Sequence, residues 1–433
     1  MVRKCCGRLA QFPRDPEEGG RVVRCIPHQA SRKSFVKGKV CMESVFRFQS
    51  PQNIFYGNGS LEQLGAVAAR SGKRALMISD EMMNGLGYVE KTAAYLKSEH
   101  IESSVYLGVR SEPTDEYVEE ALAQLKEEQC DFIVSVGGGS CIDTAKAVAV
   151  LATNPGYIGE FMGGKRLAAN APLPHVAIPT TAGTGSEVTD VTVITATKTD
   201  VKMMIKQLAF MPTAAIVDPL LTLSSPKSVT ASTGMDALSH AIEAFISKKA
   251  HHMTDMYALA AMEQIIPNLK RVYQDGNDIE ARRSMSLGSM QAGAAFSNAS
   301  VCLVHGMSRP VGALFHVPHG MSNAMLLPPV LEFSKEYCIE RLAVIGKLFA
   351  RDGDEPESDR EYAELAVKQV RELAAFLNIP NLQGWGVDGE RFHESLGKMA
   401  RDAIDSGSPA NNPRVPTVDE IIELYKTSYS YKF

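Results

Sequence analysis

The sequence lacks the cysteine spacing that marks zinc knuckles and disulfide frameworks. Its eight cysteines include no CxxC pair, and they are scattered along the chain. Four of them precede Met42: Cys5, Cys6, Cys25 and Cys41. The chain therefore predicts neither a cysteine-built zinc site nor a fold stapled by disulfides.

Long apolar runs and an excess of positive charge are also missing. No run approaches the roughly 18 apolar residues that a membrane-spanning helix needs, and the N-terminus has no secretory apolar core. The net charge of -5 leaves no broad basic surface for nucleic acid or anionic lipid. We therefore expect a cytoplasmic protein that acts on small molecules, without nucleic-acid or membrane partners.

Residues 1–41 show no regular apolar period and are rich in Arg and Lys, broken by Pro and Gly. Such a segment cannot bury enough apolar surface to order itself. We expect a disordered extension or an artefact of an upstream reading frame, with the mature protein starting at Met42. A mitochondrial presequence is an alternative, but Asp15, Glu17 and Glu18 depart from its acid-poor pattern.

The remaining chain changes character once. With 433 residues and 45% hydrophobic content, it is long enough for two domains with a cleft between them. The β-rich runs "RALMISD", "DFIVSVGGGS" and "HVAIPTTAGTGSE" alternate with helical patterns, which predicts a parallel sheet covered on both faces. Long helical periods follow. We predict an α/β domain over 42–224, an all-helical domain over 225–433, and a hinge near Ser224–Pro226.

A glycine turn follows the second of these strands. In "DFIVSVGGGSCIDTAK" an apolar strand runs into Gly137, Gly138 and Gly139 and then into a helix. Bare backbone and the free amides of a helix start suit a diphosphate. The turn matches neither GxGxxG nor a Walker A loop, so a tight turn that serves packing alone remains an alternative.

Two other strand ends carry polar residues. Asp80 ends "RALMISD", where its carboxylate could accept from an adenosine ribose hydroxyl and repel a 2′-phosphate, or could be a solvated loop acid. The loop "PTTAGTGSEVT" supplies Thr180, Thr181 and Thr184, which suit diphosphate or nicotinamide contacts or a satisfied turn. Because Asp80 precedes the glycine turn, the topology must differ from the standard Rossmann order.

The helical half contains a set of potential metal ligands. In "GMDALSHAIEAF", Asp236 and His240 lie four residues apart and therefore on one helix face, and the alternative is an ordinary surface pair. In "VHGMSRPVGALFHVPHG", Pro310 and Pro318 are expected to interrupt regular helix, so that His305 and His319 converge from a helix and a following loop. One Asp with three His would suit a divalent transition metal.

Together, "GGGSCIDTAK", "PTTAGTGSE", "GMDALSHAIEAF" and "HGM…PHG" resemble the iron-containing alcohol dehydrogenases, relatives of glycerol dehydrogenase and dehydroquinate synthase. The resemblance extends from about Val45 to Tyr425. It implies a Rossmann-like NAD-binding domain, a helical metal-binding domain, and a homodimer or higher homo-oligomer. It also implies metal ligands at Asp236, His240, His305 and His319, with Fe²⁺ as the metal. Zn²⁺ would also accept this donor set.

The resemblance further implies cofactor contacts at ten positions. Asp80 would lie at the adenosine ribose and favour NAD over NADP, and Lys202 would lie toward the nicotinamide. The diphosphate and nicotinamide side would be formed by Gly137, Gly138, Gly139, Ser140, Asp143, Thr180, Thr181 and Thr184.

Arg309 is the main departure from the family pattern, since many members carry a histidine there. We expect it at the substrate pocket, favouring an anionic substrate, or else as a structural arginine paired with an acid of the cleft. The predicted activity is hydride transfer between a small alcohol, which the metal activates, and NAD. The alternatives are an NAD- and metal-dependent lyase of the dehydroquinate synthase type, or a non-catalytic binding protein.

Overall fold

The computed structural model describes residues 45–351, 353–354 and 356–433. Contacts divide the chain into Met1–Val45 and Phe46–Phe433, and the fold below is that of the second part. The predictions for residues 1–41 and for a start at Met42 lie outside the described residues.

A parallel sheet of six strands forms the centre of the first half, in the order β1-β8-β5-β4-β2-β3. The predicted strands in "RALMISD", "DFIVSVGGGS" and "HVAIPTTAGTGSE" are confirmed as β2, β4 and β5. The strands are β1 (Asn53–Tyr56), β2 (Arg74–Ile78), β3 (Glu102–Tyr106), β4 (Phe132–Gly137), β5 (His175–Pro179) and β8 (Ala214–Val217). A separate antiparallel hairpin pairs β6 (Val191–Ala196) with β7 (Val201–Lys206).

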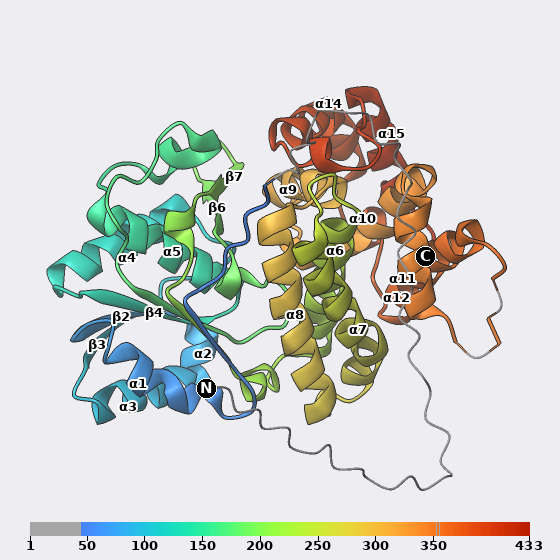
Figure 1. The fold of residues 1–433 in the computed structure, drawn as a ribbon. Helices are drawn as coiled ribbons and strands as arrows, with labels where there is room; N and C mark the ends of the chain where they lie inside the picture. The colour runs from blue at the N-terminus through green and yellow to red at the C-terminus, as the bar shows by residue number, and fades with distance from the viewer. Residues whose placement is uncertain (1–44, 352, 355) are drawn as a thin grey trace, which may run out of the picture. The chain divides into compact units, whose positions relative to one another are not determined.

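Helices cover both faces of the sheet, as the continuous apolar strands require. Alternate residues of β2 enter different cores: Leu76 packs with α4 and α5, whereas Met77 packs with α1 and α3. The helices of this half are α1 (Leu64–Ala68), α2 (Glu81–Gly85), α3 (Tyr88–Ser98), α4 (Asp115–Glu127) and α5 (Gly139–Thr153). Figure 1 shows α1 and α3 on one side of β2 and β4, with α4 and α5 on the other.

The strand order reverses between β2 and β4. The chain runs outward from β2 to the edge strand β3 and then returns to the other side of β2 as β4. Ligands of open parallel sheets bind outside the carboxyl ends of the strands at such a reversal. Asp80, just after β2, and the glycine turn after β4 both lie at this point.

The second half is helical, and α6 is its centre. Fifteen of the 20 residues of α6 are buried, because α7, α8 and α10 pack around it. The helices are α6 (Lys227–Ile246), α7 (His252–Gln274), α8 (Ile279–Ala299), α9 (Leu303–Phe315), α10 (His319–Ser334), α11 (Ile339–Phe349), α12 (Asp359–Phe376), α13 (Leu382–Trp385), α14 (Gly389–Asp405) and α15 (Val418–Tyr429). The predicted fold class, α/β followed by all-α, is confirmed (Figure 1).

The change from strands to helices falls at the start of α6, one residue after Pro226. The domain limits and the hinge at Ser224–Pro226 stay predictions. Among the described residues, every helix is too short or too polar to cross a bilayer.

Candidate metal centre and nucleotide site

The helix α6 carries Asp236 and His240 on one face, as their spacing predicts. Apolar Met235, Leu238 and Ile242 are fully buried around them, so this helix is surrounded by protein on all sides. The two polar side chains are buried as well, at 1% and 2% exposure. A buried carboxylate requires partners, because an unpaired charge in the interior is costly.

The other two predicted ligands come from α9 and α10. His305 lies in the first turn of α9, and His319 is the first residue of α10. The predicted helix break at Pro310 is wrong, since α9 runs through this residue to Phe315. The proline ring costs a helix about 3 kcal/mol, but Leu303–Gly312 are all buried and this packing outweighs the cost. The chain turns instead between His316 and Pro318, so His319 begins a helix and does not lie in a loop.

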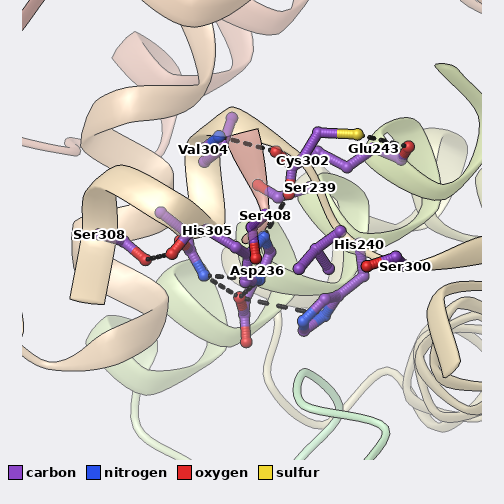
Figure 2. A network of polar contacts seen from close by, with 12 residues as sticks. Asp236, Ser239, His240, Glu243, Ser300, Cys302, Val304, His305, Ser308 and Ser408 are labelled. Carbon is purple, nitrogen blue, oxygen red and sulfur yellow. Dashed lines mark hydrogen bonds and ion pairs between the residues drawn. The ribbon is translucent and has the colours of Figure 1, made fainter. Parts of the chain in front are cut away.

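The four side chains converge. Asp236, His240, His305 and His319 each offer one ligand atom, and these four atoms lie within 4.8 Å of one another. Asp236 Oδ1 lies 3.6 Å from His305 Nε2 and 3.8 Å from His319 Nε2. Figure 2 shows Asp236, His240 and His305 pointing toward one another from α6 and α9. The i, i+4 pair and the two distant histidines therefore form one cluster, as expected from the sequence.

The protonation states suit a cation. Burial lowers the pKa of His240 to about 3 and that of His319 to about 4, so both imidazoles are neutral near pH 7. Burial alone would raise the pKa of Asp236, but His240 and His319 outweigh it and the pKa falls below its usual range. One carboxylate and neutral imidazoles with free lone pairs are the donors that a divalent transition metal prefers.

Glu243, which sequence reasoning missed, orients His305. Its carboxylate accepts a hydrogen bond from His305 Nδ1 and another, of 2.7 Å, from the Val304 backbone N–H. A proton held at Nδ1 leaves the lone pair of Nε2 directed at Asp236. Burial would lower the pKa of His305, but Glu243 and Asp236 outweigh it and raise the pKa. Glu243 is two helical turns beyond Asp236, and this spacing was the available signal.

The contacts of Asn323 indicate whether a cation would fit the cluster. Its Nδ2 lies 2.6 Å from Asp236 Oδ1, 2.9 Å from His305 Nε2 and 3.1 Å from His319 Nε2. An amide nitrogen has two hydrogens, so it cannot satisfy three acceptors. Its own buried Oδ1 has no partner among the described residues. The cluster holds more lone pairs than donors, which is the arrangement that a metal ion completes. Asn323 follows His319 by four residues on α10, a spacing that could have found it.

The glycine turn packs too closely for a side chain at Gly137 and leads directly into α5. Gly137 ends β4 with φ at +156°, and a Cβ there would lie 2.5 Å from Cys141 Sγ. A side chain at this residue is therefore excluded on both grounds. Gly138 precedes α5 and Gly139 begins it, so the free N–H groups of this helix face the turn.

Asp80 lies next to this turn and is not a solvated loop acid. Its Oδ1 accepts from the Met83 N–H at 2.8 Å and so caps α2, while Oδ2 lies 3.6 Å from Cys141 Sγ. The half-buried carboxylate therefore keeps one oxygen directed toward the turn after β4.

The threonine loop also lies at the carboxyl end of the sheet. Thr180 follows β5, donates its N–H to the Gly137 carbonyl at 3.0 Å, and has a buried Oγ1 without a partner among the described residues. A Cβ on Gly138 would lie 3.6 Å from Thr181 Oγ1, and a Cβ on Gly139 would lie 2.7 Å from Thr184 Cγ2. The two loops are therefore in contact.

Asp143 and Lys202 have protein partners of their own. Ser186 Oγ and the Val193 N–H donate to Asp143, and Lys146 Nζ lies 3.8 Å away. Lys202 pairs with Glu112 at 2.8 Å. The other carboxylate oxygen of Glu112 accepts from the His319 N–H, so Lys202 supports the start of α10.

A cavity of about 180 Å³ joins the two sites. His240, His305 and His319 contribute to its wall, as do Gly139 and Ser140 of the glycine turn. The His319 side chain is 29% exposed, whereas those of the other three proposed ligands are at most 4% exposed. The cluster is therefore accessible from the side of His319.

Arg309 also borders this cavity, and its place at a substrate pocket stays a prediction. Its Nη1 donates to Ser408 Oγ at 3.0 Å, and its Nη2 lies 3.1 Å from Met204 Sδ. No described residue places a carboxylate oxygen within hydrogen-bonding distance of this guanidinium, but the Glu243 carboxylate acts on it at longer range and raises its pKa against the larger effect of burial.

Comparisons with known proteins confirm the resemblance. The family model of the iron-containing alcohol dehydrogenases matches residues 51–219, and that of the C-terminal region of this family matches residues 230–429. The chain is 37% identical over 389 residues to a 1,3-propanediol dehydrogenase of Citrobacter freundii, covering 89% of this chain and 99% of the relative. It is 35% identical over 382 residues to an NAD-dependent methanol dehydrogenase of Bacillus methanolicus, covering 88% of this chain and 99% of that one.

The fold is also that of a solved structure of the family. The crystal structure of a 1,3-propanediol oxidoreductase matches with a TM-score of 0.85 and 36% identity, over 89% of this chain and 100% of that one. Both halves of the chain and the arrangement between them are thus shared with this oxidoreductase. The chain belongs to the iron-containing alcohol dehydrogenase family.

Proposed function

We propose that the protein interconverts small alcohols and aldehydes with NAD, using a metal ion held by Asp236, His240, His305 and His319. The observation that carries this proposal is the convergence of four ligand atoms within 4.8 Å at a cavity that the glycine turn also borders. The metal would supply Lewis acidity toward the alcohol oxygen, and the nicotinamide would supply the hydride acceptor.

The residues of the chain would bind and orient the reactants. The three imidazoles and Asp236 would hold the ion, and Glu243 would fix His305 with Nε2 unprotonated. The glycine turn and the start of α5 would hold the diphosphate, with the threonine loop beside it. With these groups bound, an alcohol would be oxidised to an aldehyde, with the nicotinamide as hydride acceptor and water as acceptor of the hydroxyl proton, and the reverse reaction would reduce an aldehyde.

Iron(II) is the metal that the family favours, and Zn²⁺ would accept the same donors. NAD is favoured over NADP, because the carboxylate of Asp80 would repel a 2′-phosphate. Dehydrogenases among the relatives favour this activity over a lyase of the dehydroquinate synthase type.

We also propose that the protein is a homodimer or a higher homo-oligomer. Among the described residues, β1 is an edge strand of the sheet, and its outer edge could pair with a second copy. Light scattering of the purified protein measures the mass directly, and a monomer at micromolar concentration would contradict this proposal.

The activity is tested by following NADH absorbance with a panel of primary alcohols, diols and hydroxy acids after loading with Fe²⁺. Alcohol-dependent NADH formation should be abolished by chelation and restored by added metal. The variant His305→Ala should lose bound metal and turnover together while keeping its fold and its NAD affinity. Stoichiometric metal in this variant would remove His305 from the ligand set, and activity that resists complete metal removal would refute the proposal.

A further inference from the structure

Arg309 lies on the same face of α9 as the proposed ligand His305, four residues further along the helix. It borders the cavity, and only 7% of its surface is exposed. The guanidinium is thus enclosed beside the proposed metal centre. Charged side chains are seldom buried to this degree without a partner.

The contacts of Arg309 do not account for its burial. A serine hydroxyl and a methionine sulfur are its polar contacts among the described residues, and neither carries a negative charge. Arg282 offers a comparison, since it is also buried and without a carboxylate. Its guanidinium donates to three oxygens, those of Gly276, Thr230 and Ser225, at 2.9 to 3.2 Å. Arg309 lacks such a set.

The other charged side chains around the cavity that lie outside the metal cluster are paired. Lys206 donates to Asp190 at 2.8 Å, Glu112 pairs with Lys202 at 2.8 Å, and Asp143 lies 3.8 Å from Lys146. Among the described residues of this wall, Arg309 is therefore the charged side chain without an ion pair. Glu243 acts on it only at longer range, and the oxygens of Glu243 already accept from Val304 and His305. Burial lowers the pKa of Arg309 to about 10, which leaves the guanidinium protonated at neutral pH.

We propose that Arg309 determines substrate specificity by binding the carboxylate of a short hydroxy acid, or of the corresponding aldehyde acid, whose alcohol carbon lies at the metal centre. This inference rests on the proposed dehydrogenase activity and adds the class of substrate. A guanidinium holds a carboxylate with two parallel hydrogen bonds, which gives both affinity and orientation.

The spacing on α9 sets the length of the substrate. Residues four apart are separated by about one turn, or roughly 5.4 Å along the axis, and side chains of a helix lean toward its N-terminus. A chain of about three to five carbons would place its carboxylate at Arg309 and its alcohol oxygen at the metal centre. The carboxylate is unchanged in the reaction, because the hydride and the proton both leave the alcohol end.

The test compares 4-hydroxybutyrate with 1-butanol, which have the same carbon skeleton, as substrates of the metal-loaded enzyme. In the wild type, kcat/KM should be at least roughly tenfold higher for 4-hydroxybutyrate, which is the effect of a charge-assisted hydrogen bond. In Arg309→Met this selectivity should fall by roughly 10- to 100-fold, mainly through KM for the acid. The selectivity of Arg309→Lys should lie between those of the wild type and Arg309→Met, because lysine keeps the charge but not the paired hydrogen bonds.

Arg282→Met is the matched control, since it also removes a buried arginine that lacks a carboxylate partner. It should lower the melting temperature while leaving the selectivity at the wild-type value. If Arg309 were purely structural, Arg309→Met would likewise lower the melting temperature and leave the selectivity unchanged. An unchanged selectivity in Arg309→Met therefore overturns the proposal.

Inhibition of the wild type keeps the test decisive if the variants do not fold. Butyrate should inhibit 1-butanol oxidation competitively, with a Ki at least roughly tenfold lower than that of butyramide, its uncharged analogue. Equal Ki values, or a wild-type preference for 1-butanol over 4-hydroxybutyrate, would overturn the proposal. If neither alcohol is oxidised, the proposed dehydrogenase activity itself has failed, which distinguishes the two conclusions.

Discussion

Glu243 is the carboxylate that holds His305 in position, and its replacement by glutamine tests that role with little change in shape. The glutamine Oε1 could still accept from the Val304 N–H, as Glu243 Oε1 does at 2.7 Å. Its amide nitrogen would then face His305 Nδ1, and two donors would meet. The imidazole must lose this hydrogen bond or move its proton to Nε2, which removes the lone pair that a metal needs.

The size of the effect follows from the contact that is lost. A buried hydrogen bond to a charged group contributes about 1.5–3 kcal/mol. Loss of such a partner behind a metal-bound histidine lowers metal affinity by about 10- to 100-fold, which is about 1.4–2.8 kcal/mol. The two estimates agree. We therefore expect the metal dissociation constant of Glu243→Gln to rise by this factor, with a smaller change in the melting temperature of the metal-free protein.

The assay is anaerobic competition for Fe²⁺ or Zn²⁺ against a chromophoric chelator. Glu120→Gln is a suitable control. Glu120 lies on α4, outside the metal cluster, and its carboxylate accepts a hydrogen bond of 2.7 Å from the Tyr106 hydroxyl. This control should bind metal like the wild type. An unchanged dissociation constant in Glu243→Gln would show that His305 keeps its ligand geometry without the carboxylate, and would refute the positioning role.

Three other perturbations test separate parts of the structure. Asp80→Gly should raise NADP-dependent rates and weaken NAD binding, and equal use of both cofactors by the wild type would contradict the role of this acid. Gly293→Ala should destabilise the fold by about 1–3 kcal/mol in thermal unfolding, because its Cβ would lie 2.6 Å from the Gly185 carbonyl oxygen, whereas Gly85→Ala meets nothing within 4 Å and should not. Burial raises the pKa of Glu187 from 4.5 to about 7, so the native state favours the protonated form and stability falls as pH rises between these values. Glutamine cannot ionise, so the free energy of unfolding of Glu187→Gln should rise by on the order of 3 kcal/mol relative to that of the wild type across this pH range. Free energies from urea unfolding that follow pH in parallel for the two proteins would contradict this.

The parts of the site that the sequence predicts are those with a local signature. Asp236 and His240 share a helix face at a fixed spacing, and the glycine turn follows an apolar strand. Their geometry depends on a few neighbouring residues, so periodicity is sufficient to find them. The order of the sheet could not be derived in this way, since it depends on which strands pair across distant parts of the chain.

Contacts between distant parts of the chain explain why the sequence did not predict Glu243, Asn323 and Ser408. Glu243 and Asn323 lie at helical spacings from proposed ligands, but their contacts with the cluster are made between helices. Glu243 of α6 contacts His305 of α9, and Asn323 of α10 contacts Asp236 of α6. Ser408, which contacts Arg309, is 99 residues away in sequence and carries no local signal. Pro310 is the opposite case, because its local preference predicts a break that the packing of α9 overrides.

The four proposed ligands are distributed over three helices, so the ion would act as a cross-link between α6, α9 and α10. A ligand that binds only the folded state stabilises it by about 2.7 kcal/mol at a concentration 100 times its dissociation constant. In a metal-starved cell this stabilisation of the folded state would be lost. The three helices would then separate more often and become accessible to proteases. The lifetime of the protein would then follow the supply of metal, so that its abundance as well as its activity would decline when iron is scarce.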